Sequence, residues 1–135
     1  MRNKPCLTLE DAKTIAAAAE AEARKHGWNV TIAVLDDGGH LLYLQRMDGT
    51  PPSTAEIATH KGRSAALARR STKAMEDRII NGRVALIKMP GMLPVQGGEP
   101  IMAGGECVGA VGVSGVQSHD DAQIALAGIA ALKTG

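Results

Sequence analysis

The chain is almost free of aromatic side chains, which limits the cores and sites that it can build. Its 135 residues include no Phe, one Trp and one Tyr, although 44% of the chain is hydrophobic. Ala and Gly make up much of the bulk, and small side chains bury little apolar area each. We therefore expect a homo-oligomer, a dimer or larger. Sites that stack nucleic-acid bases on several aromatic rings are excluded.

Charge is balanced and scattered along the sequence. The net charge is +1, from 15 Lys and Arg against 14 Asp and Glu, and no block of five like charges occurs. This pattern predicts neither nucleic-acid binding nor a polybasic membrane anchor. No apolar run reaches the length of a membrane span, and the first residues lack a secretory signal. We expect one cytoplasmic domain over residues 1–135, with Cys6 and Cys107 as reduced thiols.

Helix start signals occur at four places. A hydroxyl followed three residues later by a carboxylate, the capping-box pattern, is found three times: Thr8 with Asp11, Ser53 with Glu56, and Ser118 with Asp121. Apolar residues recur at helical spacing behind each signal, which predicts helices over about 8–26, over 53–70, and from 118 to near the end. Ser71 or Thr72 is expected to cap a shorter helix with Met75 and Ile79 facing inward.

Runs of β-branched residues and glycine turns predict an antiparallel sheet. We expect strands over 28–35 and 40–47 around a turn at 36–39, an irregular edge strand over 95–102, and a strand over 107–113. The apolar run 84–87 fits a strand or a helix equally well. The order α-β-β-α-α-(β)-β-β-α predicts an α+β fold, with four to five antiparallel strands flanked by helices.

Two histidines are the first candidate ligand contacts. None of the four histidines forms an HxxxH, HxH or HExxH pair, so no metal site is predicted. His40 begins a strand beside a glycine turn, and His60 lies on a helix next to Lys61. Both are candidates for contact with a ligand, and a plain surface position stays open for each.

Two glycine-rich segments carry further candidates. Glycines recur every third residue from Gly109 to Gly115 ahead of the last helix, where free N–H groups suit an anion and close packing is the alternative. Ser114 and Gly115 are the candidates there. The second segment holds Met92 and the Gly97-Gly98 pair; Met92 fits a haem ligand, a pocket wall or a core filler.

Three stretches together resemble the GlcG/HbpS family of small haem-binding-like proteins, which includes the C-terminal domain of PduO-type proteins. They are Ile32–Leu41 running on to Arg46-Met47-Asp48-Gly49; Lys61-Gly62-Arg63-Ser64-Ala65; and Gly91-Met92-Leu93-Pro94 with Gly97-Gly98, followed by Val108–Gly115 and Asp120-Asp121. Their order and spacing cover about residues 7–133. Gly62 departs from the family, which usually has a Lys-Ala pair at this place.

The resemblance implies a profilin-like antiparallel sheet flanked by helices, homo-oligomers and, for some members, binding of haem or a related tetrapyrrole. It implies pocket-lining roles for Lys61, Gly97 and Gly98. Our own inference adds His40, His60 or Met92 as an axial ligand. Lys61, Arg63 and Arg46 would supply positive charge for the propionates.

These observations favour a small-molecule binding protein with an accessory, storage or sensing role over a conventional enzyme. Two alternatives stay open. In one, the chain is a catabolic enzyme or enzyme subunit acting on a small organic carboxylate, held by Arg46, Lys61 and the 112–115 loop, with Asp48 or His60 as general base. In the other, it is an oligomeric scaffold without a small ligand.

Overall fold

Each strand of the sheet runs antiparallel to its neighbours, in the order β2-β1-β4-β3. The computed structural model describes residues 1–133. Its elements are α1 (Leu9–Lys25), β1 (Thr31–Asp36), β2 (Leu41–Arg46), α2 (Thr54–Ala68), α3 (Thr72–Ile80), the 3-10 helix η1 (Val84–Lys88), β3 (Gly98–Ala103), β4 (Glu106–Ser114) and α4 (Ser118–Ala130). The α+β class and the element order are confirmed. The ambiguous run 84–87 folds as η1, so the sheet has four strands.

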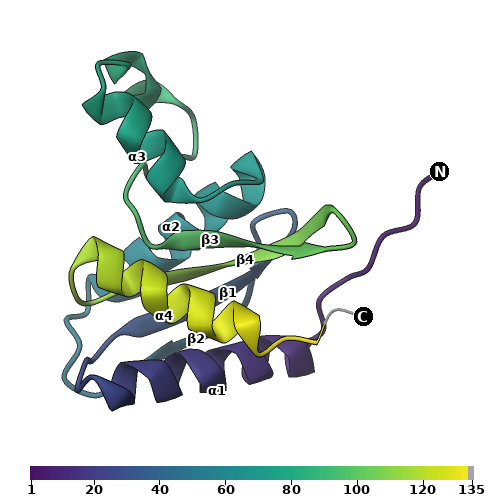
Figure 1. Cartoon of the computed structure of the whole chain (residues 1–135), viewed down its shortest axis with the longest axis vertical. Helices are drawn as coiled ribbons and strands as arrows, with labels where there is room; N and C mark the ends of the chain where they lie inside the picture. Colours follow the sequence, from purple (N-terminus) through teal and green to yellow (C-terminus); the bar gives the residue numbers. More distant parts are fainter. Residues whose placement is uncertain (134–135) are drawn as a thin grey trace.

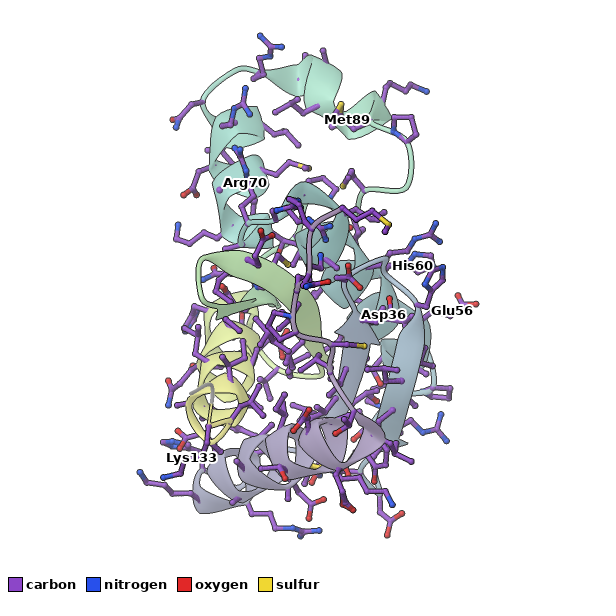
Figure 2. All side chains as sticks on the ribbon, turned by 90° about the vertical axis from the view of Figure 1, so that its right-hand side faces the viewer. Asp36, Glu56, His60, Arg70, Met89 and Lys133 are labelled. Atoms are coloured by element: carbon purple, nitrogen blue, oxygen red, sulfur yellow. The ribbon has the colours of Figure 1, made fainter. Side chains whose placement is uncertain are left out.

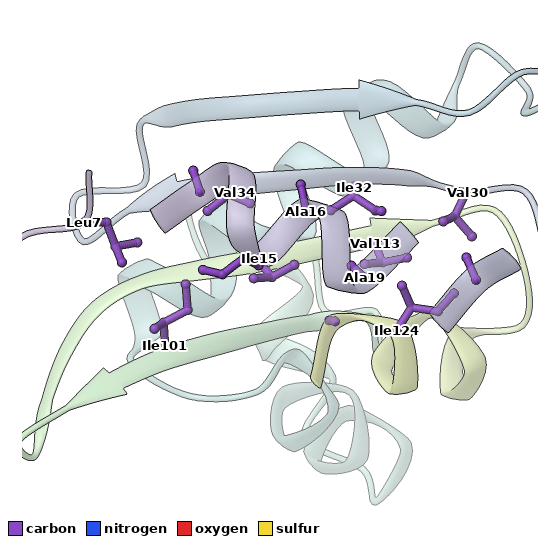
Figure 3. Packing of buried hydrophobic residues seen from close by; sticks show 14 of the residues in the cluster. Leu7, Ile15, Ala16, Ala19, Val30, Ile32, Val34, Ile101, Val113 and Ile124 are labelled. Carbon is purple, nitrogen blue, oxygen red and sulfur yellow. The ribbon is translucent and has the colours of Figure 1, made fainter. Parts of the chain in front are cut away.

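Helices cover both faces of the sheet. Helices α1 and α4 lie together on one face, and α2 crosses the other (Figure 1). Side chains of β1 alternate between the two layers: Ile32 and Val34 face α1 and α4, whereas Ala33 and Leu35 face α2. Figure 3 shows the larger layer, in which aliphatic side chains fill the space between sheet and helices.

One of the three predicted capping boxes forms. At α1, the Thr8 side chain accepts from the N–H of Asp11, and the Asp11 carboxylate accepts from the N–H of Thr8. The prediction of a capping box at Ser53 is wrong, because Ser53 already has helical backbone angles and its side chain makes no capping hydrogen bond. The box at Ser118 is also wrong: Gln117 precedes the helix without a side-chain cap.

Residues 69–92 form a lobe that stands off the edge of the sheet. This α3–η1 lobe lies beyond β3 (Figure 1). Ser71 caps α3 through the N–H of Lys73, as expected, and Met75 faces inward. Four large apolar side chains of the lobe are exposed: Ile80, Val84, Ile87 and Met89. Among the described residues, no helix is both long and apolar enough to cross a bilayer.

Candidate functional site

Several of the residues singled out in the sequence meet around a buried ion pair. Lys61 lies on α2, and its Nζ lies 2.9 Å from Asp121 Oδ2 of α4 and 3.1 Å from the carbonyl oxygen of Val113. Lys61 is only 2% exposed and Asp121 1%. The Asp121 carboxylate balances the charge of this ammonium. Lys61 thereby connects α2, on one face of the sheet, with α4 on the other, and it also contacts β4. Its contact with a ligand stays a prediction.

Sequence reasoning missed the role of Asp121. Its second oxygen, Oδ1, accepts from the N–H of Val116 at 3.1 Å, so the carboxylate fixes the loop before α4 instead of capping the helix through Ser118. Burial raises the pKa of Asp121, and the Lys61 ammonium acts in the opposite direction. Local spacing could not show this pairing, because its partner lies 60 positions away.

Close backbone packing explains the glycines near this ion pair. A Cβ at Gly98 would lie 2.1 Å from the Lys61 carbonyl oxygen, and one at Gly97 2.8 Å from Lys61 Nζ. On β4, a Cβ at Gly112 would lie 1.8 Å from the carbonyl oxygen of Ala58 in α2. These glycines let helix and strands approach each other, which is the close-packing alternative for the β4 segment.

Of the proposed anion contacts, Arg46 and Ser114 are both register partners of Thr31 on β1, whereas Arg63 lies beside Gly39 in the β1–β2 turn. Ser114 is buried at the end of β4, and Gly115 follows with its backbone against Asn29. Acidic residues fill the first turn of α4 beside them, which opposes an incoming anion. Arg46 and Arg63 are exposed on β2 and α2. Anion binding by these four residues stays a prediction.

Both candidate histidines are on the surface. The His40 side chain is 81% exposed, and its Nδ1 lies 3.3 Å from Asp36 Oδ2. His60 is exposed on α2, on the side that carries Glu56 (Figure 2). Neither lines a cavity described below. Within residues 1–133, no group of three His, Cys, Asp or Glu side chains is arranged to hold a metal ion.

A cleft between the end of α2 and the α3–η1 lobe is lined by apolar and cationic side chains, the two kinds that an amphipathic ligand needs. It has a volume of about 320 Å³. Its lining consists of three Met, two Leu, one Ala and two Arg side chains: Leu67, Ala68, Arg70, Met75, Arg78, Leu86, Met89 and Met92. Arg70 and Met89 lie on different sides of it (Figure 2). Met92 is the one residue of this lining that the sequence singled out as a ligand contact.

The cleft walls are fixed by bonds to the body. Helix α2 ends where Arg69 turns the chain with φ 57°, a left-handed C-cap. The start of α3 is then tied to β3, because Ser71 Oγ donates to Glu99 Oε1 at 2.8 Å and Thr72 Oγ1 accepts from the N–H of Gly98 at 3.0 Å. On the opposite wall, the N–H of Leu93 donates to Ser64 Oγ at 2.7 Å.

This arrangement suits a flat apolar ligand with carboxylates. Thioethers adapt their shape to an apolar surface and can ligate haem iron. The guanidinium groups of Arg70 and Arg78 can each pair with a carboxylate. The expected inward position of Met75 and the candidate ligand Met92 were the sequence signals; the two arginines gave none, because only folding brings them to the same cleft.

Comparison with known families confirms the resemblance. The family model described as "Haem degrading protein HbpS-like" matches residues 7–130. Protein GlcG of Escherichia coli K12 is 47% identical over 114 residues, which cover 84% of this chain and 85% of GlcG. A 15.0 kDa protein from the dhaT-dhaS intergenic region of Citrobacter freundii is 32% identical, covering 88% of this chain and 87% of that protein.

Solved structures share the fold over almost the whole chain. A double mutant of Streptomyces reticuli HbpS superposes with a TM-score of 0.90 at 36% identity, covering 98% of this chain and 91% of HbpS. A PduOC–haem complex gives 0.85 at 23% identity, covering 97% and 98%. At that identity the PduOC likeness supports the fold alone.

Proposed function

Because the chain belongs to the HbpS-like family, we propose that it binds haem or a related tetrapyrrole in the cleft under the α3–η1 lobe. The observation that carries this proposal is the lining, three thioethers and an aliphatic wall beside two guanidinium groups. Bound haem would bring an iron that takes axial ligands and two propionates that take cations. We propose a storage, sensing or accessory role in the cytoplasm.

Each part of the lining has a proposed task. Met92 Sδ is the axial ligand candidate, because it lies in the cleft, whereas His40 and His60 do not line it. Arg70 and Arg78 would hold the propionates. Leu67 and Leu86 would exclude water from the macrocycle edge. The flat face of the macrocycle would therefore rest on aliphatic and sulfur atoms, in keeping with a chain that has one Trp and one Tyr.

We also propose that a second copy covers the open side of the cleft. The exposed apolar side chains of Ile80, Val84 and Ile87 lie on the same lobe and would lose water contact in such an assembly. Light scattering after size-exclusion chromatography measures the oligomer directly. A monomer at micromolar concentration with and without haem would contradict this part of the proposal.

Haem titration tests the site. Ferric haem is added to the protein, and the Soret band and the dissociation constant are recorded. We expect saturable binding that the double variant Arg70→Ala/Arg78→Ala weakens about tenfold or more. Met92→Leu should shift the Soret band, because it removes the sulfur and keeps the volume. His40→Ala and His60→Ala are the controls and should bind as the parent does.

The opposite pattern would overturn this assignment. If His60→Ala abolishes the Soret shift and Met92→Leu does not, the axial ligand is on α2 and haem does not bind in the cleft. A second arm adds ascorbate in air to the complex. A stable Soret band supports storage or sensing, whereas steady loss of the band shows that this protein degrades haem and contradicts a role limited to binding.

A further inference from the structure

A second cavity, of about 400 Å³, lies at the end of the molecule away from the cleft. It is lined by the N-terminal segment, the first turn of α1, the β3–β4 turn and the residues after α4: Pro5, Cys6, Leu7, Asp11, Ala103, Gly104, Val108, Leu132 and Lys133. The N-terminal segment lies at this side (Figure 1), and Lys133 is distant from Arg70 and Met89 (Figure 2). The two cavities share no lining residue.

The wall formed by the N-terminal segment is held in place although it has no regular structure. Arg2 pairs with Glu106, and Lys4 Nζ lies 2.6 Å from Asp37 Oδ2. The Lys4 hydrogen bond lowers the pKa of Asp37. Leu7 is 7% exposed in the core and lies against Gly109 of β4, where a Cβ would be 2.5 Å from its Cδ1. The buried Leu7 side chain therefore anchors the segment that forms this wall.

The lining carries one negative and one positive side chain on an apolar background. The Asp11 carboxylate keeps its position because its Oδ2 accepts from the N–H of Thr8 at 2.8 Å. The other charged lining residue is Lys133. Pro5, Leu7 and Val108 supply an aliphatic surface between them.

We propose that this cavity binds a small apolar molecule that carries both an ammonium and a carboxylate, as a free aliphatic amino acid does. A ligand with a carboxylate alone would meet Lys133 favourably and Asp11 unfavourably. A ligand with an amine alone would be attracted by Asp11 and repelled by Lys133. A zwitterion meets both charges favourably, and its side chain would occupy the aliphatic surface.

The test measures by calorimetry the binding of three probes that share the leucine side chain. They are L-leucine, 4-methylpentanoate without the amine and 3-methylbutylamine without the carboxylate. We expect L-leucine to bind at least tenfold more tightly than either probe with one charge. Lys133→Met and Asp11→Asn should each weaken leucine binding about tenfold; the Asn side chain still accepts from Thr8. Lys13→Met removes one exposed cation from α1 outside the cavity and serves as the control.

The affinity of each variant for the probes with one charge is a second measurement, and a purely structural role of the residue would not change it in the expected direction. Lys133→Met should bind 3-methylbutylamine more tightly than the parent, because the repelling ammonium is gone. Asp11→Asn should bind 4-methylpentanoate more tightly for the same reason. Equal affinity for all three probes, no saturable leucine binding at millimolar concentration, or loss of leucine binding in Lys13→Met would overturn the proposal. Haem titration of the same variants should be unchanged.

Discussion

The Lys61–Asp121 pair is buried, with Nζ and Oδ2 2.9 Å apart, so the loss of either member should be costly. Removing one member of a buried pair leaves an uncompensated charge and costs about 3–5 kcal/mol. We expect losses of this size for Lys61→Met and for Asp121→Asn in urea unfolding. The double variant Lys61→Met/Asp121→Leu should recover a large part of the loss, because neither charge remains.

An exposed pair provides the matched control. Lys73 and Asp77 are also 2.9 Å apart, but their side chains are 52% and 48% exposed. Lys73→Met should leave the free energy of unfolding almost unchanged, since water solvates the remaining carboxylate. Equal losses at Lys61 and Lys73 would show that burial is not the cause.

At this scale the sequence predicts which residues matter better than it predicts their partners. Lys61 was singled out as a pocket-lining residue, and the structure shows it in a buried ion pair, so its contact with a ligand stays a prediction. Thr8 with Asp11 was correctly read as a cap, because a cap is local in sequence. Asp121 matched the same local pattern and was misread. Its partner is set by the packing of α2 and α4 on the sheet, and a single sequence holds no signal for that contact.

At the scale of elements, the contact between α2 and β4 depends on glycine. A Cβ at Gly112 would meet the carbonyl oxygen of Ala58 at 1.8 Å and the N–H nitrogen of Gly62 at 2.5 Å. Because these are backbone atoms, the helix must move away, and we expect Gly112→Ala to destabilise the protein by about 1–3 kcal/mol or more. Thermal unfolding measures the change.

Gly38→Ala is the control for the helix–strand contact. Its Cβ would lie 2.9 Å from the ring of His40, an exposed side chain that can turn away. We expect a much smaller change in the unfolding temperature than for Gly112→Ala. A similar change in both variants would mean that loss of glycine flexibility, and not the contact with α2, sets the effect.

The start of α3 should give stability a pH dependence through Glu99. Glu99 is 8% exposed on β3, and burial raises its pKa above the ordinary 4.5, against the hydrogen bond from Ser71. The folded chain thus holds this proton more tightly than the unfolded chain. The stabilising contribution is fully present below pH 4.5 and is lost as the pH rises through the folded pKa.

Glu99→Gln tests this sign. The amide stays neutral and still accepts from Ser71, so the variant should lose stability less than the parent does as the pH rises. The difference between the two free energies of unfolding should therefore grow from pH 4 to pH 7 in urea titrations. Parallel curves would show that the Glu99 carboxyl does not titrate differently in the folded state.

Sequence patterns identified most elements because their signals are periodic and local. The 84–87 run stayed ambiguous, since four apolar residues fit a buried strand or a helical turn equally well. In the structure it pairs with no strand and closes on itself, with the N–H of Leu86 bonded to the carbonyl of Arg83. The cleft that η1 completes was invisible for the same reason.

For the whole molecule, the positive charge is concentrated in one contiguous segment that folds as a separate lobe. The α3–η1 lobe, residues 69–92, holds six Lys or Arg and two acidic residues, a net charge of +4, so the remainder carries −3. A search for blocks of like charges does not register this excess, because the six basic residues are spaced along the segment. If haem enters the cleft as we propose, its propionates approach the positive end of a charge-separated molecule, and the field should speed association.

Stopped-flow mixing with haem at increasing salt measures this effect. We expect the association rate constant to fall as ionic strength rises, since salt screens charges beyond about 8–10 Å. Arg83→Glu changes the lobe by two charges without touching the cleft lining, and it should slow association with little change in dissociation. Lys13→Glu makes the same charge change on α1 and should have a smaller effect. Equal slowing in both variants would show that net charge, and not the position of the lobe, governs the approach of the ligand.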